Sequence, residues 1–287
     1  MSAQIYSGKE VAAALDEGTA QQVAELKAAG VQPTLAILRV GARPDDLSYE
    51  KGATKRAEKV GLAVRNVVLD EDVTQEDLLA TVQQLNEDAG VHGVLMFRPL
   101  PKHLDEALIC NALDPAKDID GFTVGSLASV FSNDTSGFAP CTAQSCVEIL
   151  NHYGVDLSGK RAVVVGRSLV IGKPVAMMLL ARNATVTIAH SRTKDLPKVT
   201  SEADVVIACV GRAQMLTAEY FTEGQSVIDV GINFTDEGQL VGDVDTAAAS
   251  EVVAGITPVP GGVGSVTTSV LCRHVVDAAK RLGGIDD

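Results

Sequence analysis

The stretch VVVGRSLVIGKP, residues 163–174, has the residue types of a phosphate-binding turn. An apolar run ends at Gly166, and a helix is expected to start near Pro174, which lacks an amide hydrogen and suits the first turn of a helix. Backbone amides at such a helix start can hold an anion. The spacing excludes a Walker A loop, because five residues separate Gly166 from Gly172 and a proline stands where a hydroxyl should reach Mg²⁺.

The stretch also departs from the G-x-G-x-x-G dinucleotide fingerprint. Ser168 occupies the second glycine position, although the strand–turn–helix context is the expected one. The next expected strand ends in residues 190–193, HSRT, where an NAD-preferring unit usually carries an acid for the ribose hydroxyls. Ser191 and Arg192, together with Arg167, would attract a 2′-phosphate, so the sequence favours NADP over NAD. The alternatives are a tight turn without a ligand and a solvated basic loop.

Strands and helices are expected to alternate around this turn, which indicates βαβ units and parallel sheets. Periodicity is lost between residues 123 and 142, where a domain boundary is expected. The chain is therefore predicted to be an α/β protein. The predicted strands are 33–41, 62–69, 91–97, 161–166, 184–189, 204–210 and 226–232, and the predicted helices are 8–29, 45–61, 74–88, 142–152, 173–182, 194–202 and a last one that follows the glycine-rich turn and runs to about 282.

Composition limits the partners. The 287-residue chain has 37 acidic and 24 basic residues, a net charge of −13, which argues against nucleic acid or an anionic membrane as a general partner. Aromatic residues make up only 3%, so aliphatic side chains must fill the core, as in parallel sheets buried on both faces. The five cysteines show no metal-ligand spacing and are expected to be reduced thiols. No secretory signal or membrane-length apolar run is found, so a cytoplasmic protein is expected.

Several motifs together resemble one enzyme family. VVVGRSLVIGKP, ATVTIAHSRT, VIDVGIN and ITPVPGGVG, with RPLP and DPAKDIDGF in the first half, are similar to the bifunctional methylenetetrahydrofolate dehydrogenase/methenyltetrahydrofolate cyclohydrolase family. The resemblance covers nearly the whole chain and implies two α/β domains around a cleft. One is a folate-binding catalytic domain, residues 1–140 completed by the C-terminal helix 268–287, and the other a Rossmann-type NADP-binding domain, residues 141–267. A tetrahydrofolate derivative as substrate and a homodimer paired through the Rossmann domains are also implied.

The resemblance implies roles for individual residues. Tyr49 would pack on the folate and the Asp120 carboxylate would bind the pterin ring, which makes both candidate catalytic residues. Without the family pattern, Tyr49 would be interpreted as a half-buried aromatic and Asp120 as a cap or turn residue. No metal site is implied. The cofactor-binding set is Gly166, Arg167, Ser168, Gly172, Pro174, Ser191, Arg192, Gly211 and Ile232. The substrate-binding set is Tyr49, Phe97, Pro99, Asp120, Pro258, Gly261 and Gly262.

The folate side departs from the family pattern at its acid/base group. The family carries Tyr-x-x-x-Lys, which places the lysine one helical turn after the tyrosine, and Ala53 stands at that position here. Lys51 is a substitute candidate for the catalytic lysine. It lies roughly 160° from Tyr49 around an ideal helix, so it would need a distortion at Gly52.

The folate side differs from the family pattern at further positions. Phe97 replaces a glutamine that supports the lysine, and Arg98 replaces the first leucine of LPLP. About three residues are missing after Phe122, PCTAQS replaces PCTPxG, and residues 265–266 replace a Pro-Met pair. The cofactor turn is therefore retained while the folate site is altered.

The two reactions of the family depend differently on that lysine. Hydride transfer to NADP⁺ moves no proton at the reacting carbon, so positioning supplies much of its catalysis. Hydrolysis of the methenyl group is general acid–base chemistry, typically worth about 10²–10⁴-fold. We therefore predict oxidation of 5,10-methylenetetrahydrofolate to 5,10-methenyltetrahydrofolate with NADP in one-carbon metabolism, with methenyltetrahydrofolate cyclohydrolase activity weak or lost. The alternatives are full bifunctionality, a non-catalytic folate- or nucleotide-binding paralogue, and a dehydrogenase for another small substrate.

Overall fold

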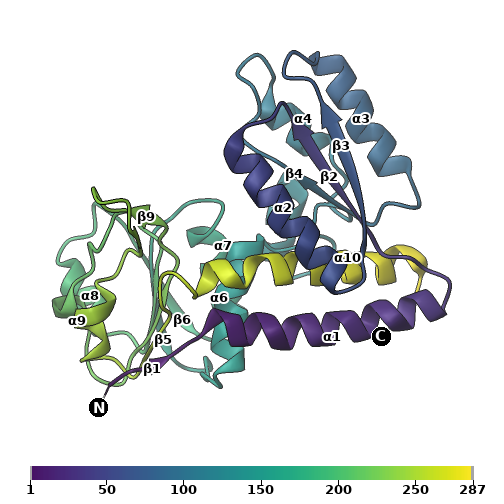
Figure 1. Ribbon diagram of the computed structural model, residues 1–287. Helices are drawn as coiled ribbons and strands as arrows, with labels where there is room; N and C mark the ends of the chain where they lie inside the picture. Colours follow the sequence, from purple (N-terminus) through teal and green to yellow (C-terminus); the bar gives the residue numbers. More distant parts are fainter. Residues whose placement is uncertain (1, 286–287) are drawn as a thin grey trace. The chain divides into compact units, whose positions relative to one another are not determined.

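The chain divides into two compact α/β units in the computed structural model, which describes residues 2–285 (Figure 1). Unit 1 takes in the N-terminal segment up to Ala13 and residues 142–267, and unit 2 takes in residues 14–141 and the C-terminal segment from Thr268. Both units contain a parallel sheet with helices between successive strands. The two-domain α/β fold expected from the sequence is confirmed.

Unit 2 is built on a three-stranded parallel sheet in the order β3-β2-β4. The central strand is buried along most of its length, which explains its nearly continuous apolar sequence. The strands are β2 (Thr34–Val40), β3 (Ala63–Leu69) and β4 (Gly93–Met96). The helices are α2 (Pro44–Lys59), α3 (Gln75–Glu87), α4 (Glu106–Ala112), α5 (Val124–Ser132), and most of α1 (Gly8–Ala28) and α10 (Thr267–Gly283).

Side-chain caps start three helices of unit 2. Thr74, Asp105 and Thr123 accept amide hydrogens at the starts of α3, α4 and α5. The sequence shows no helical periodicity between residues 123 and 142, yet α5 forms within this range. Its apolar side chains Val124 and Phe131 are 66% and 78% exposed, so this helix lacks the buried apolar stripe by which an amphipathic helix is predicted.

Unit 1 is built on a six-stranded parallel sheet in the order β1-β11-β8-β7-β5-β6. The chain runs from β5 to β6 on one side and then to β7 on the other side, and such a change of direction is where open α/β sheets bind ligands. The strands are β1 (Gln4–Ile5), β5 (Arg161–Val165), β6 (Thr185–Ala189), β7 (Val205–Ala208), β8 (Ser226–Asp229) and β11 (Gly255–Ile256), with a hairpin of β9 (Asn233–Phe234) and β10 (Leu240–Val241). The helices are α6 (Cys141–His152), α7 (Gly172–Leu180), α8 (Leu196–Ser201), η1 (Ala218–Tyr220), α9 (Thr246–Ser250) and η2 (Val263–Ser265).

The N-terminal segment differs from the expected division of the chain. Residues 1–140 were assigned to the first domain, whereas the segment up to Ala13 lies with unit 1. Strand β1 pairs with β11, the Tyr6 hydroxyl lies 2.9 Å from Ser226 Oγ, and the Tyr6 ring stacks on Tyr153 at 4.6 Å between centroids. A two-residue strand has no periodicity, so no local pattern predicts this pairing.

All five cysteines are free, and four of them are buried. Across residues 2–285, no helix has both the length and the hydropathy that crossing a bilayer requires.

Gly255 tests the docking of the N-terminal segment. A Cβ at Gly255 would lie 2.2 Å from Cζ of Tyr6, so Gly255→Ala must displace the tyrosine ring. We expect the free energy of unfolding of unit 1, measured in urea, to fall by about 1–3 kcal/mol. The control is Gly18→Ala in α1, which has nothing within 4 Å of its Cβ and should not destabilise the protein. Unchanged stability of Gly255→Ala would contradict the docking.

Candidate active site

The turn after β5 depends on the close approach of three backbone segments. Gly166 has φ +143°, and a Cβ there would lie 2.3 Å from the carbonyl oxygen of Cys209, just after β7. A Cβ at Gly172, the first residue of α7, would lie 2.4 Å from the carbonyl oxygen of Gly166. No side chain fits at either position. The spacing between the two glycines is therefore set by contact between β5, α7 and the end of β7.

Ser168 caps the start of α7. Its hydroxyl oxygen accepts hydrogen bonds from the amides of Ile171 at 3.1 Å and Gly172 at 3.4 Å. We expected the amides of this helix start to receive an anion, but two of them are bonded to Ser168 instead. Because the hydroxyl acts as acceptor in both bonds, its own hydrogen can donate to a bound anion. The exposed Ser168 thus presents a single donor in place of two amides.

A cavity of about 490 Å³ opens beside this turn, and we call it the nucleotide cavity. Gly166, Arg167, Ser168 and Ser191 line it, as the sequence analysis expected of a cofactor site. Arg192 and Gly211 are exposed next to lining residues, and Gly172 and Pro174 are buried at the start of α7. The remaining lining residues were not predicted from the sequence, and they are Val165, His190, Thr193, Leu196, Cys209, Val210, Arg212, Met215 and Tyr220.

The strand order of the sheet explains why most of the unpredicted residues line the nucleotide cavity. The neighbours of β5 are β6 and β7, and the segments that follow these strands supply His190, Thr193, Cys209 and Val210 to the cavity wall. The carboxyl ends of neighbouring parallel strands lie at one edge of the sheet, where ligands bind. Arg167 and Arg212 are the charged residues among the described lining, and none of that lining is acidic. The cavity is thus suited to an anionic ligand.

The segment after β6 forms a compact turn. The amide of His190 donates to Thr193 Oγ1 at 2.8 Å, and the amide of Thr193 donates to the His190 carbonyl oxygen at 2.8 Å. The amide of Arg192 donates to His190 Nδ1 at 3.2 Å. These bonds leave Ser191 and Arg192 exposed at the end of β6, the position at which a Rossmann unit discriminates between cofactors.

A second cavity of unit 1, of about 230 Å³, lies against the glycine-rich turn 260–265. It brings together the predicted site residues Ile232, Pro258, Gly261 and Gly262. The start of α1 supports this turn, because the Gly8 amide donates to the Gly261 carbonyl oxygen at 2.8 Å. We call this second cavity the turn cavity.

In unit 2, Tyr49 and Phe97 are in contact. Their rings meet edge to face with 5.7 Å between centroids, and Tyr49 remains 39% exposed. One turn further along α2, Ala53 is fully buried. The helix is unbroken across Gly52, so Lys51 stays on another face of α2, where it is exposed. The structure therefore does not bring Lys51 to the Tyr49 face.

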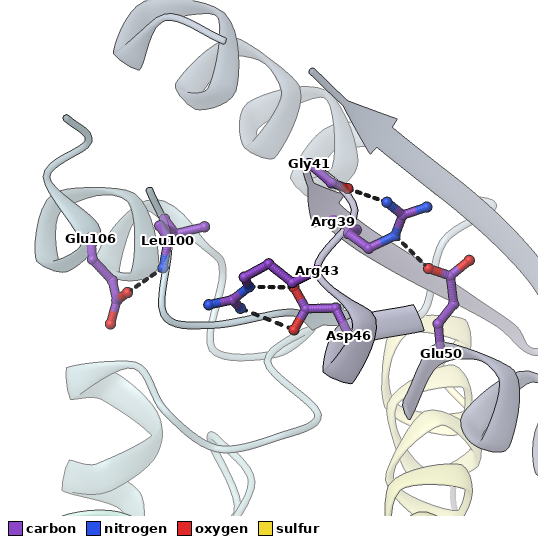
Figure 2. A network of polar contacts seen from close by, with 7 residues as sticks. All are labelled: Arg39, Gly41, Arg43, Asp46, Glu50, Leu100 and Glu106. Atoms are coloured by element: carbon purple, nitrogen blue, oxygen red, sulfur yellow. Dashed lines mark hydrogen bonds and ion pairs between the residues drawn. The ribbon is translucent and has the colours of Figure 1, made fainter. Parts of the chain in front are cut away.

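A buried ion pair fixes the helix that carries Tyr49 (Figure 2). Arg39 Nε, at the end of β2, lies 2.6 Å from Glu50 Oε2, with the two side chains only 10% and 15% exposed. The Arg39 guanidinium also donates to the carbonyl oxygen of Gly41. Because Glu50 follows Tyr49 directly, this pair fixes the rotation of α2 next to the ring.

Two further contacts order the loops at the same edge (Figure 2). Arg43 donates to both carboxylate oxygens of Asp46 at 2.8 and 2.9 Å, in the first turn of α2. After β4, the amide of Leu100 donates to Glu106 Oε2 at 2.7 Å. Pro99, predicted to bind substrate, is exposed in this loop.

Asp120 is held in a turn that only glycine can complete. Gly121 has φ +68°, and a Cβ there would lie 2.5 Å from the carbonyl oxygen of Phe138 and from the nitrogen of Pro140. The other side of the turn carries Phe122, whose ring lies 4.4 Å from the guanidinium carbon of Arg98.

The surroundings of Asp120 favour its neutral form. Burial raises the pKa of Asp120 to about 6, and the neighbouring Asp118 carboxylate adds to the rise, while Arg98 and the Cys141 thiol oppose it. The loss of water around the Tyr49 ring, and after it the Asp120 carboxyl group, raise the pKa of Tyr49. At neutral pH, the Tyr49 hydroxyl therefore keeps its proton and can donate a hydrogen bond.

Comparison with known proteins decides the family. The model of the tetrahydrofolate dehydrogenase/cyclohydrolase catalytic domain matches residues 6–120, and that of the family's NAD(P)-binding domain matches residues 140–282. The chain belongs to the tetrahydrofolate dehydrogenase/cyclohydrolase family. This confirms the family that the motifs indicated.

Individual relatives extend over nearly the whole chain. The bifunctional protein FolD of Clostridioides difficile is 52% identical over 277 residues, 96% of each chain. The crystal structure of bifunctional FolD from Campylobacter jejuni has a TM-score of 0.93 and 38% identity, covering 97% of this chain and 99% of that one. FolD of Trypanosoma brucei, complexed with NADP cofactor and inhibitor, has a TM-score of 0.89 and 34% identity, covering 98% of both chains.

These relatives support the dehydrogenase/cyclohydrolase function of the family for this chain. They give no support to the expected loss of cyclohydrolase activity, and they favour the bifunctional alternative. Within residues 2–285, no group of three or more His, Cys, Asp or Glu side chains is arranged to hold a metal ion.

The raised pKa of Asp120 predicts how stability varies with pH. Its folded-state pKa of about 6 exceeds the ordinary value of 3.8. Protonated Asp120 therefore makes its full contribution to the free energy of unfolding below about pH 4, and this contribution is lost as the pH rises through 6. Asp120→Asn removes the titration, so we expect the variant to melt at a higher temperature than the wild type at pH 7.5. The difference should shrink towards pH 4.

The exposed Asp72→Asn, in the turn before α3, is the matched control and should show no such pH-dependent difference. A difference between Asp120→Asn and the wild type that stays constant from pH 4 to 7.5 would contradict the raised pKa.

Proposed function

We propose that this protein oxidises 5,10-methylenetetrahydrofolate to 5,10-methenyltetrahydrofolate with NADP⁺, with unit 1 binding the cofactor and unit 2 the folate. We further propose that its methenyltetrahydrofolate cyclohydrolase activity is weak or lost. The observation that carries the proposal is a contrast between the two units. Unit 1 has a closed glycine turn beside a cavity suited to anions, whereas the Tyr49 face of α2 carries a buried alanine one turn after the tyrosine.

Several side chains of unit 1 fit a phosphorylated dinucleotide. Arg167 and the Ser168 hydroxyl would hold the diphosphate at the start of α7. Ser191 and Arg192 would hold the 2′-phosphate that distinguishes NADP from NAD. The bound cofactor supplies the hydride acceptor.

On the folate side, the proposal gives Tyr49 and Asp120 binding roles. The Tyr49 ring would pack on the substrate, with Phe97 supporting it from the edge. The Asp120 carboxylate would accept hydrogen bonds from the pterin ring. Hydride transfer then depends on positioning, because no side chain has to move a proton at the reacting carbon.

Hydrolysis requires a group that gives and takes a proton near neutral pH. Ala53 has no such group, and the exposed Lys51 lies on another face of α2. The Tyr49 hydroxyl has a raised pKa and is a weak acid. These three side chains therefore leave hydrolysis without an efficient acid/base group.

Full bifunctionality is the second candidate, and two observations favour it. The relative from Clostridioides difficile is named a bifunctional protein at 52% identity. In addition, Asp120 has a pKa of about 6, close to the value that suits a general acid or base at neutral pH.

We also propose, from the family resemblance alone, that the protein is a cytoplasmic homodimer.

The reaction itself separates the two candidates. The protein is incubated with methylenetetrahydrofolate and NADP⁺, and the absorbances of NADPH and the methenyl compound are followed separately. We expect steady NADPH formation with the methenyl compound accumulating. Decay of the methenyl compound above its uncatalysed rate would support bifunctionality, and the absence of both signals would contradict the dehydrogenase assignment.

Restoring the lysine tests the cause of the defect. We expect Ala53→Lys combined with Phe97→Gln to increase methenyl hydrolysis by at least about tenfold, because acid–base groups contribute about 10²–10⁴-fold. The matched control is Ala57→Lys, one turn further along α2. No gain in the double variant would mean that the missing lysine does not explain the loss.

Arg192 tests the choice of cofactor. We expect Arg192→Ala to lower kcat/KM for NADP⁺ by about 10–100-fold, since a hydrogen bond to a charged group is worth about 1.5–3 kcal/mol. The value for NAD⁺ should change less than twofold. Lys194→Ala removes the same charge from a nearby exposed position and serves as the control. Equal losses with both cofactors would contradict a contact with the 2′-phosphate.

A further inference from the structure

Two buried carboxylates at the carboxyl edge of the sheet of unit 1 have no role in the function proposed above. Asp229 is the last residue of β8, and Asp243 follows β10. They are 1% and 0% exposed. A buried carboxylate is costly unless hydrogen-bond donors surround it, so the donors around these two show what the groups hold in place.

Asp243 receives four hydrogen bonds, three of them from consecutive backbone amides. Its Oδ2 accepts from Val210 at 2.6 Å and from Gly211 at 3.1 Å, and its Oδ1 accepts from Arg212 at 2.9 Å. The fourth donor is Asn233 Nδ2, at 2.9 Å from Oδ1. The loop after β7 thus forms a concave set of amides of the kind that binds anions, and a carboxylate of the protein itself fills it.

Asp229 holds Asp243 in turn. Its Oδ1 accepts from the amides of Gly231 and Asp243, both at 2.9 Å, and its Oδ2 accepts from the amide of Val244 at 3.0 Å. The fit leaves no room for side chains, because a Cβ at Gly242 would lie 1.8 Å from Asp229 Oδ2. Asp229 therefore fixes the position of the Asp243 backbone.

The loop that Asp243 holds is a wall of the nucleotide cavity. Val210 and Arg212 both line that cavity. Gly211 between them has φ +68°, so the loop takes a conformation that depends on glycine at that point. Asn233, the fourth partner, follows Ile232, which lines the turn cavity. One carboxylate therefore contacts segments of both cavities of unit 1.

We propose that Asp243 is a positioning residue for the nucleotide. Its carboxylate holds residues 210–212 in place as a preformed wall of the nucleotide cavity. The inference rests on the proposed function, in that unit 1 must bind a nucleotide. A loop that is already ordered does not lose conformational freedom when the ligand binds, so the ordering cost is removed from the binding free energy. Asp243 itself does not contact the ligand.

The test is Asp243→Asn in the full-length protein. Asparagine keeps one acceptor oxygen and turns an amino group towards backbone amides that also donate, so at least one charge-assisted bond is lost and a donor faces donors. We expect the dissociation constant of 2′,5′-ADP, measured by calorimetry, to rise about tenfold or more. The KM for NADP⁺ should rise by the same factor. The KM for methylenetetrahydrofolate should stay within twofold, and kcat at saturating NADP⁺ within threefold.

Asp245→Asn is the matched control. Asp245 lies two residues further on and also accepts a backbone amide, that of Ala248 at 3.2 Å, but it lines neither cavity. We expect its dissociation constant for 2′,5′-ADP to equal that of the wild type within twofold. If Asp243→Asn binds 2′,5′-ADP as the wild type does and only its melting temperature falls, the role is merely structural and the proposal is overturned.

Two further measurements complete the test. If the wild type itself binds no 2′,5′-ADP, the nucleotide assignment of unit 1 fails and takes this inference with it. If Asp243→Asn does not fold, hydrogen exchange of the wild type without nucleotide decides instead. We expect the amides of residues 210–212 to be as protected as those of β7, and exchange at the rate of an exposed loop would overturn the proposal.

Discussion

The close backbone approach at Gly166 is the constraint on which the cofactor half depends. A strand, a helix start and the end of a neighbouring strand meet within a distance that admits no Cβ at Gly166 or Gly172. This contact sets where α7 begins and brings Ser168 onto the first amides of that helix. It also places Cys209 and the loop after it against the turn, so that the ends of β5, β6 and β7 share one cavity. The close backbone contact alone therefore accounts for glycine at both positions.

The sequence predicts the parts of this fold that repeat a local pattern. The buried strand β2 and the capped helix α3 follow from apolar runs and end signals, and each was predicted to within a few residues. The pairing of β1 with β11 could not be predicted, since its partner lies about 250 residues away and its two residues have no periodicity. Arg212 and Tyr220, which line the nucleotide cavity, were missed for a related reason. Only the strand order shows that their segments reach the turn after β5.

The folate half shows a different balance between stability and chemistry. Asp120 is kept in surroundings that raise its pKa to about 6, which costs stability at neutral pH and is a common property of functional carboxyl groups. The Arg39–Glu50 pair fixes α2, yet the Tyr49 face of that helix carries Ala53 and meets Phe97, which follows β4, and neither side chain can transfer a proton. Sequence motifs identify the family from both halves of the chain. They do not predict whether the protein hydrolyses methenyltetrahydrofolate, because an acid/base role depends on a pKa that the three-dimensional surroundings set.

A single-turnover experiment measures hydride transfer and hydrolysis in the same sample and shows whether the first occurs without the second. The protein, in excess over methylenetetrahydrofolate, is mixed with saturating NADP⁺, and the folate products are quantified after chemical quenching. We expect one methenyl group per NADPH, with the methenyl compound then decaying only at its rate in buffer alone. Formation of 10-formyltetrahydrofolate on the time scale of NADPH formation would contradict this expectation.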